Sequence, residues 1–79
     1  MSVSFKSLEE LYSRLTPALT VRKEELSKEG YSYIKEEDIF EALRRGKWNT
    51  SVNLTLFDLV NDILNINIEV VDAYLKQKY

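Results

Sequence analysis

The sequence contains no cysteine and no histidine, and it has only one proline, two glycines and one methionine. Without cysteine, the chain can form neither a disulfide, nor a thiolate metal site, nor a cysteine nucleophile. Without histidine, it lacks the side chain most often used for proton transfer near neutral pH. We therefore predict a protein that is not an enzyme and that carries no cofactor and no metal.

The sequence also lacks an excess of positive charge and a long apolar run. Thirteen acidic and eleven basic residues give a net charge of -2, so any nucleic acid must be bound by a local patch. No apolar run approaches the ~20 residues that span a bilayer, and the N-terminus lacks the apolar core of a signal peptide. We expect a complete cytoplasmic protein without membrane insertion.

The composition predicts one small folded domain over residues 1–79. Hydrophobic residues make up 44% of the chain and charged residues 30%, which is typical of a globular protein. A core of this size rarely supplies more than about 3–5 kcal/mol of net stability, so a homo-oligomer is a reasonable expectation.

The segment Gly30 to Trp48 contains the clearest helix, which we predict at about Glu36 to Arg45. Three carboxylates would occupy its first turn after Lys35, itself a poor N-cap, and Ile34 and Ile39 have the spacing of a hydrophobic staple. Gly46 can close the helix in a left-handed conformation. We expect the core face of this helix to consist of Ile39, Phe40 and Leu43. Large apolar side chains should anchor its two ends, namely Tyr31, Tyr33 and Trp48.

A first helix should begin at about Leu8, after a capping box formed by Ser7 and Glu10. Pro17 leaves two interpretations open, because it either starts a new helix after Thr16 or kinks a single helix. We prefer a break or a sharp kink near Thr16. Gly30 should end the charged segment that follows.

Two more helices should follow the central one. Residues 47–51 predict a polar loop with Ser51 and Asn53 as candidate caps, and residues 54–64 predict the most buried helix. Asn67 should cap a last helix with Val70, Val71, Tyr74 and Leu75 facing inward, although residues 66–71 could instead form a strand. The predicted fold is all-α, a compact bundle of four to five short helices.

Arg44, Arg45, Lys47 and Trp48 form the only dense basic cluster. Cations beside an aromatic ring are what single-stranded RNA binding uses, because the charges meet phosphates and the ring stacks on a base. The alternative is that these residues serve only the fold. In that case the arginines balance the helix dipole and Trp48 fills the core. A DNA-reading helix is disfavoured, since the carboxylates in the first turn of the central helix would meet phosphates.

Two further groups of residues are candidates for binding. Asp58 and Asp62 lie four residues apart and could offer oxygen ligands to a cation, but no calcium-loop glycine accompanies them, and a hydrated polar stripe explains them better. The sequence has nine aromatic residues, more than a small core needs. Phe5, Tyr74 and Tyr79 are therefore candidates for a partner or dimer surface.

An ordered set of short motifs resembles a known family. The motifs are Leu15-Thr-Pro-Ala-Leu19, Gly30-Tyr31, Glu37-Asp-Ile39, Leu43, Lys47-Trp48 and Leu59-Val-Asn-Asp-Ile-Leu64. In that order and spacing they resemble the ComN-type post-transcriptional regulators of low-GC Gram-positive bacteria.

The resemblance implies a small cytoplasmic protein that is not an enzyme and that acts, directly or indirectly, on the mRNA of late competence genes. It also implies recruitment to division septa and cell poles by a scaffold of the DivIVA type. The alternative function is an adaptor that binds such a scaffold without contacting nucleic acid.

Overall fold

The computed structural model describes residues 8–50 and 54–78. These residues form helices and connecting turns and contain no strand, so the all-α prediction is confirmed and the alternative strand at residues 66–71 is wrong. None of these helices is long and apolar enough to cross a membrane. The helices are α1 (Leu8–Lys28), α2 (Glu36–Arg45), the single-turn α3 (Lys47–Thr50), α4 (Leu56–Leu64) and α5 (Ile68–Lys78).

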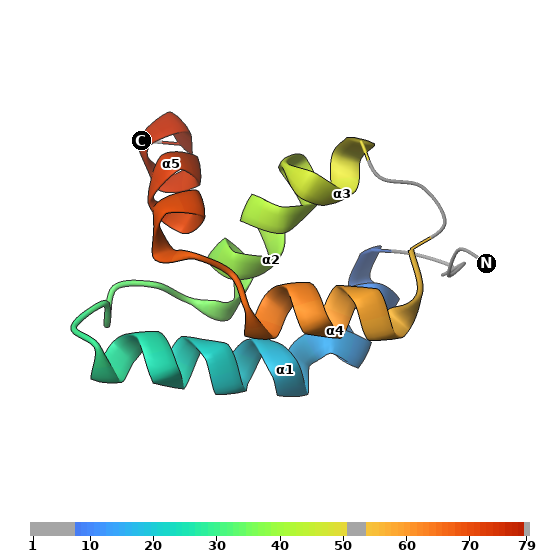
Figure 1. The fold of residues 1–79 in the computed structure, drawn as a ribbon, viewed down its shortest axis with the longest axis horizontal. Coiled ribbons are helices and arrows are strands. Elements are labelled where there is room, and N and C mark those ends of the chain that lie inside the picture. Colours follow the sequence, from blue (N-terminus) through green and yellow to red (C-terminus); the bar gives the residue numbers. More distant parts are fainter. Residues whose placement is uncertain (1–7, 51–53, 79) are drawn as a thin grey trace.

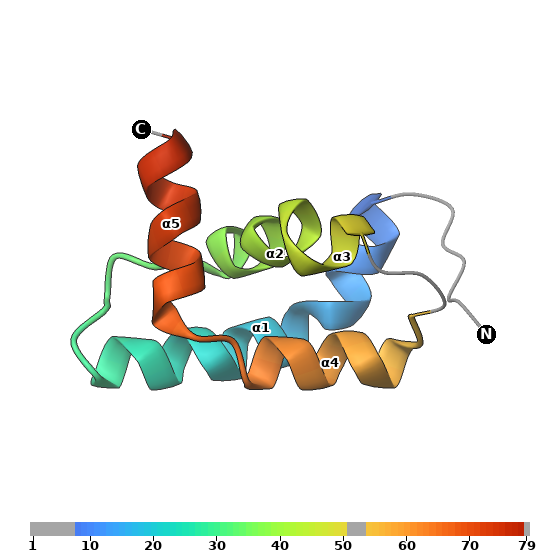
Figure 2. The ribbon, with the colours of Figure 1, turned by 45° about the horizontal axis from the view of Figure 1, so that its top comes forward.

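The helices form two layers, with α5 standing at one end (Figures 1 and 2). Helices α1 and α4 lie side by side in the lower layer and run in the same direction, while α2 and α3 lie above them. Helix α2 contacts all four other helices. The largest fully buried side chains are Leu15, Leu19, Leu26, Ile34, Ile39, Ile63 and Val71.

Helix α2 has the bounds predicted from the sequence, and a side chain inside it explains why it can begin after lysine. The Lys35 side chain has no acceptor oxygen, but the Lys35 backbone N–H donates to Asp38 Oδ2 at 3.0 Å. This bond is the second half of a capping box, and Asp38 is buried. Ile34 and Ile39 are both fully buried, as the staple predicts.

Gly30 ends α1 as expected, and its conformation shows why glycine stands there. Its φ of 102° lies in the left-handed region. The Gly30 N–H donates to the Ser27 carbonyl at 3.1 Å, and the Tyr31 N–H donates to the Leu26 carbonyl at 2.9 Å. These are the two bonds of a Schellman motif, and the half-buried Tyr31 packs against the core that contains Leu26.

Pro17 does not divide α1, so of the preferred break or sharp kink the break is wrong, and the interpretation as a single kinked helix holds. The first turns of α1 are out of line with the rest of the helix, as a kink near proline produces (Figure 2). The Thr16 hydroxyl donates to the Tyr12 carbonyl at 2.8 Å, a bond that is common where helices bend. Pro17 itself is exposed, so its ring does not disturb the core.

Two predictions about the end of α2 are wrong. Gly46 has φ -98° and ψ -103°, so it does not adopt the left-handed conformation. Its N–H donates to the Ala42 carbonyl at 3.1 Å, and a Cβ added at Gly46 would lie 3.0 Å from that oxygen. Close backbone approach therefore explains the glycine. The chain continues directly into α3, where a polar loop was predicted.

Helix α4 begins later than predicted and is not the most buried helix. Its N-cap is Thr55, whose hydroxyl accepts from the Asp58 N–H at 3.2 Å, while Ser51 and Asn53 lie outside the described residues. Only two side chains of α4 are buried, against five in α2, because Leu56, Phe57 and Leu64 are exposed and Val60 is only partly buried.

Helix α5 begins as predicted, since Asn67 Oδ1 accepts from the Glu69 N–H at 2.9 Å. Val71 is fully buried, and Tyr74 and Leu75 are partly buried against the core. Val70 is exposed, which corrects its predicted inward position. Tyr33 is also exposed rather than an apolar anchor, and its hydroxyl donates to Asp72 Oδ1 at 2.9 Å.

Candidate nucleic-acid interface

The four residues of the predicted RNA-binding cluster lie at the junction of α2 and α3, where α4 and α5 approach. Arg44 and Arg45 end α2, while Lys47 and Trp48 begin α3. The cations remain partly or largely exposed, with 36% of the Arg44 side chain, 65% of Arg45 and 61% of Lys47 accessible to solvent. The four residues have different partners. These partners decide which side chains hold the fold together and which remain available to a ligand.

Arg44 is held by Glu41, one helical turn earlier. Arg44 Nε donates to Glu41 Oε2 at 2.5 Å, and Arg44 Nη2 donates to Glu41 Oε1 at 2.8 Å. This two-pronged pair lowers the pKa of Glu41 and raises the pKa of Arg44. Glu41 therefore remains ionised and fixes the orientation of the Arg44 guanidinium.

Arg45 has looser contacts than Arg44. Its Nε lies 3.5 Å from Glu41 Oε1, and its guanidinium carbon lies 5.8 Å from the centre of the Tyr74 ring on α5. A guanidinium at this distance from an aromatic ring is attracted by the ring's negative face. The structure thus brings together one residue predicted to bind RNA and one predicted to bind a partner.

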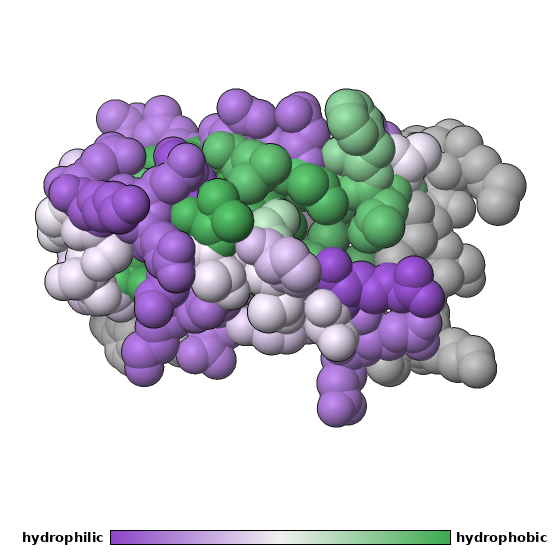
Figure 3. Space-filling model, turned by 90° about the horizontal axis from the view of Figure 1, so that it is seen from below, coloured by the Kyte–Doolittle hydropathy of each residue, from purple (hydrophilic) through white to green (hydrophobic). Residues whose placement is uncertain are grey.

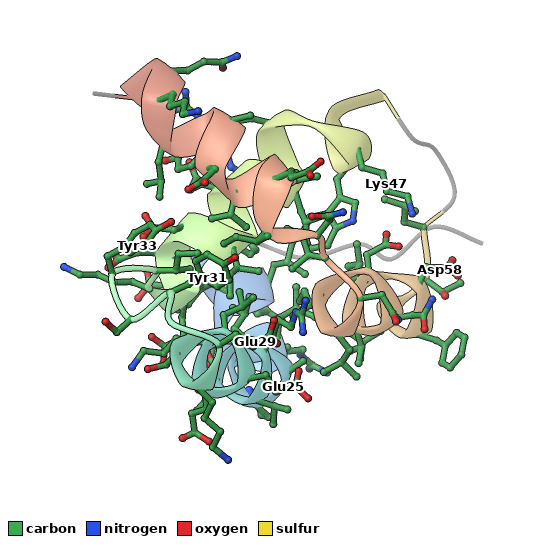
Figure 4. The ribbon with its side chains drawn as sticks, turned by 60° about the vertical axis from the view of Figure 1, so that its left-hand side comes forward. Glu25, Glu29, Tyr31, Tyr33, Lys47 and Asp58 are labelled. Carbon is green, nitrogen blue, oxygen red and sulfur yellow. The ribbon has the colours of Figure 1, made fainter. Side chains whose placement is uncertain are left out.

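Lys47 and Trp48 share a single acceptor on α4. Lys47 Nζ donates to Asp62 Oδ1 at 2.6 Å, and Trp48 Nε1 donates to Asp62 Oδ2 at 3.0 Å. Lys47 projects from α3 toward α4 (Figure 4). The half-buried Trp48 ring meets Phe40 edge to face, with centroids 6.0 Å apart. These contacts connect α3 to α4, so Trp48 is part of the core packing.

The two carboxylates reduce the charge of the cluster without cancelling it. Glu41 and Asp62 pair with the three cations, so these five side chains carry a net charge of +1, and Asp58 also feels the charge of Lys47. Ion pairs at an exposed surface contribute only about 0–1 kcal/mol, so a phosphate can replace the carboxylate of such a pair at little cost. Arg45 is the cation best placed for this exchange, because it is the most exposed of the three and its pair is longer than the Arg44 pair.

The remaining candidates have separate positions or lie outside the described residues. Phe5 and Tyr79 belong to the latter group. Asp58 Oδ2 accepts from the Thr55 N–H at 3.0 Å, which lowers the pKa of Asp58, while Asp62 holds α3. The two aspartates therefore have different roles, and the described ranges contain no group of three or more side chains that could hold a metal ion.

The sequence interpretation missed two features of the site. These are the role of Glu41 and the contact of Asp62 with the basic cluster. Glu41 could have been found, because it lies three residues before Arg44 and four before Arg45, the spacings of helix ion pairs. The contact of Asp62 with Lys47 crosses 15 positions and depends on the packing of α3 against α4. No local pattern signals it.

Comparison with known proteins identifies a family. No curated protein and no solved structure matches the chain. The family model described as "Post-transcriptional regulator" matches residues 8–78, which include every helix described above. Membership in a family of regulators agrees with the prediction from composition that the protein is not an enzyme. The chain belongs to the post-transcriptional regulator family.

Proposed function

We propose that the protein regulates messenger RNA by binding single-stranded RNA at the surface where the end of α2 faces α5. Arg45 and Tyr74 are the principal contacts, and Arg44 adds charge. The observation that carries the proposal is the exposed Arg45 guanidinium beside the Tyr74 ring. The resemblance described above supports transcripts of late competence genes as the targets.

The proposed contact combines two kinds of recognition. The Arg45 guanidinium would leave Glu41 for a backbone phosphate, which it can bind through two parallel hydrogen bonds. A base would then stack on the exposed part of Tyr74 or on the guanidinium plane, and such stacking contributes about 1–3 kcal/mol per base. Lys47 and Trp48 would hold α3 in place and contribute little to binding.

The test is a titration of a labelled single-stranded RNA from the leader of a late competence transcript, at about 50 mM salt. Arg45→Ala should weaken binding about fivefold, since a phosphate contact is lost. Lys35→Ala is the matched control, because it removes one exposed positive charge at the opposite end of the same helix. Lys35→Ala should change the affinity for RNA less than twofold, because salt screens a charge at the far end of the helix. Equal losses in the two variants would reject the assigned surface.

Glu41→Gln tests the same surface in the opposite direction. The substitution removes the carboxylate that holds both arginines, so the affinity for RNA should rise by roughly two- to fivefold. If the surface contacts two or three phosphates, a plot of the logarithm of the affinity against the logarithm of the salt concentration should have a slope of about -1.4 to -2. If the protein is an adaptor that acts without RNA, neither the wild type nor any of these variants should bind the labelled RNA.

A further inference from the structure

The lower layer of the molecule has an apolar surface that the proposed RNA contact does not use. Phe57 on α4 is 77% exposed and Val21 on α1 is 48% exposed, and Leu56 and Leu64 of α4 are also exposed. Seen from below, the apolar side chains form one patch across α1 and α4 (Figure 3). We call this patch, formed by Val21, Leu56, Phe57, Val60 and Leu64 around the nearly buried Ala18, the lower apolar face.

One flank of α1 borders this face with a pattern that is complementary to itself. Arg14, Ala18, Val21 and Glu25 follow one another at intervals of four, three and four residues, so they lie on one flank of the helix, with Arg14 just before the bend near Pro17 and the other three after it. This stripe has a positive end, a small apolar centre and a negative end. It lies on the α4 side, because Arg22, which pairs with Glu25 at 3.3 Å, donates through Nη2 to the Ile66 carbonyl just after α4 at 2.6 Å.

Reversing this stripe against a copy of itself brings unlike groups together. If the midpoint falls between Ala18 and Val21, Arg14 lies opposite Glu25 at both ends, and the exposed Val21 lies over the nearly buried Ala18 of the other copy. Arg14 lies 4.0 Å from Glu10 and Glu25 pairs with Arg22, but the Arg14 and Glu25 side chains are 60% and 51% exposed, so both can exchange these partners for a group on a second surface.

We infer that the lower apolar face binds a second copy of this chain, with α1 packed antiparallel on α1 about a two-fold axis. In a two-fold interface every contact occurs twice, so a stripe whose ends carry opposite charges is self-complementary. The apolar centre would leave water on both copies, which is the main favourable term in association. A partner of a different kind would not require that Arg14 and Glu25 be placed symmetrically about the apolar centre.

The first test is sedimentation equilibrium of the full chain without RNA, over a concentration series from about 5 to 500 µM, the range in which modest interfaces dissociate. We expect a monomer–dimer equilibrium. Val21→Glu should raise the dissociation constant at least about tenfold, because each dimer loses the apolar contact twice and gains two buried carboxylates. Val70→Glu is the matched control, since Val70 is a helical valine on α5 with 44% exposure outside this face. It should leave the constant within about twofold.

The second test exchanges the charges. Arg14→Glu and Glu25→Arg should each weaken the dimer by roughly five- to tenfold, because each places like charges opposite one another at two sites. The double variant should return to within about threefold of the original constant. Circular dichroism confirms that each variant is folded. A monomer at all concentrations would overturn the inference, as would equal effects of Val21→Glu and Val70→Glu, or a dimer that the double variant does not restore. RNA or another protein as the occupant would appear as a monomer here.

Discussion

Asp62 is the side chain that holds α3 against the rest of the protein, and replacing it should have a large and measurable effect. It accepts hydrogen bonds from both Lys47 Nζ and Trp48 Nε1, and only 10% of its side chain is exposed. Asp62→Ala removes both bonds at once and leaves the half-buried Trp48 N–H without this acceptor. Asp62→Asn retains an oxygen that can accept from Trp48 but loses the charge that attracts Lys47.

The two bonds contribute unequally to the free energy of unfolding. The pair with Lys47 is exposed on the lysine side, so it should contribute less than about 1 kcal/mol. The Trp48 bond is partly buried and ends on a carboxylate, so its loss should cost about 1.5–3 kcal/mol. Asp62→Ala should therefore cost about 2–3 kcal/mol, and Asp62→Asn about 1 kcal/mol. For a domain of this size, 1 kcal/mol lowers Tm by roughly 4–8 °C.

The assay is urea unfolding followed by tryptophan fluorescence, because Trp48 is the only tryptophan in the chain. Lys47→Met is the matched control, since it removes only the exposed partner and should cost less than about 1 kcal/mol. The expected order of stability is wild type, then Lys47→Met, Asp62→Asn and Asp62→Ala. An Asp62→Ala protein as stable as the wild type would refute the conclusion that this carboxylate anchors α3.

Three further substitutions test separate parts of the structure. Gly30→Ala should cost about 1–2 kcal/mol in thermal unfolding, because the φ of Gly30 is 102°. Nothing lies within 4 Å of an added Cβ, so the cost is that of the backbone conformation alone, and an unchanged Tm would contradict this. Asp38→Ala should cost about 1–2 kcal/mol by losing the bond from the Lys35 N–H, and urea unfolding that matches the wild type would argue against the cap. The Arg44 pair lowers the folded pKa of Glu41 below 4.5, so its stabilisation is complete above that pH and is lost as the pH falls through the folded value. Glu41→Gln should therefore lose less stability than the wild type on acidification from about pH 6 to pH 3, as measured by urea unfolding at each pH, and parallel losses would exclude this contribution.

The parts of the fold that local chemistry determines could be predicted from the sequence. The bounds of α2 follow from carboxylates in the first turn, arginines in the last turn and the staple of Ile34 and Ile39. Asn67 likewise marks the start of α5, since its side chain caps the helix it precedes. In both places, interactions within one or two helical turns decide the structure.

The parts that depend on tertiary packing could not be predicted in the same way. A glycine after two arginines is typical of a left-handed helix end, but at Gly46 the absent Cβ instead permits close approach to the Ala42 carbonyl. The polar composition of residues 47–50 predicts a loop, whereas the contacts of Lys47 and Trp48 with Asp62 stabilise a helical turn. The apolar composition of α4 predicts burial, but Phe57 faces solvent.

The candidate site shows the same division between local and distant contacts. The basic cluster and its aromatic neighbour are visible in the sequence, and so is the pairing of Arg44 with Glu41, three residues apart. The contact between Arg45 and Tyr74 joins residues 29 positions apart on two helices, and it shifts the predicted aromatic partner of the cations from Trp48 to Tyr74. Only the packing of α5 on α2 reveals this arrangement.

Amide chemical shifts of the ¹⁵N-labelled protein, recorded by NMR during titration with single-stranded RNA at low salt, test the central proposal most directly. Binding between α2 and α5 should shift residues 44–46 and 73–77 and leave the amides of the lower apolar face unchanged. Shifts confined to α1 and α4, or none at saturating RNA, would contradict the account.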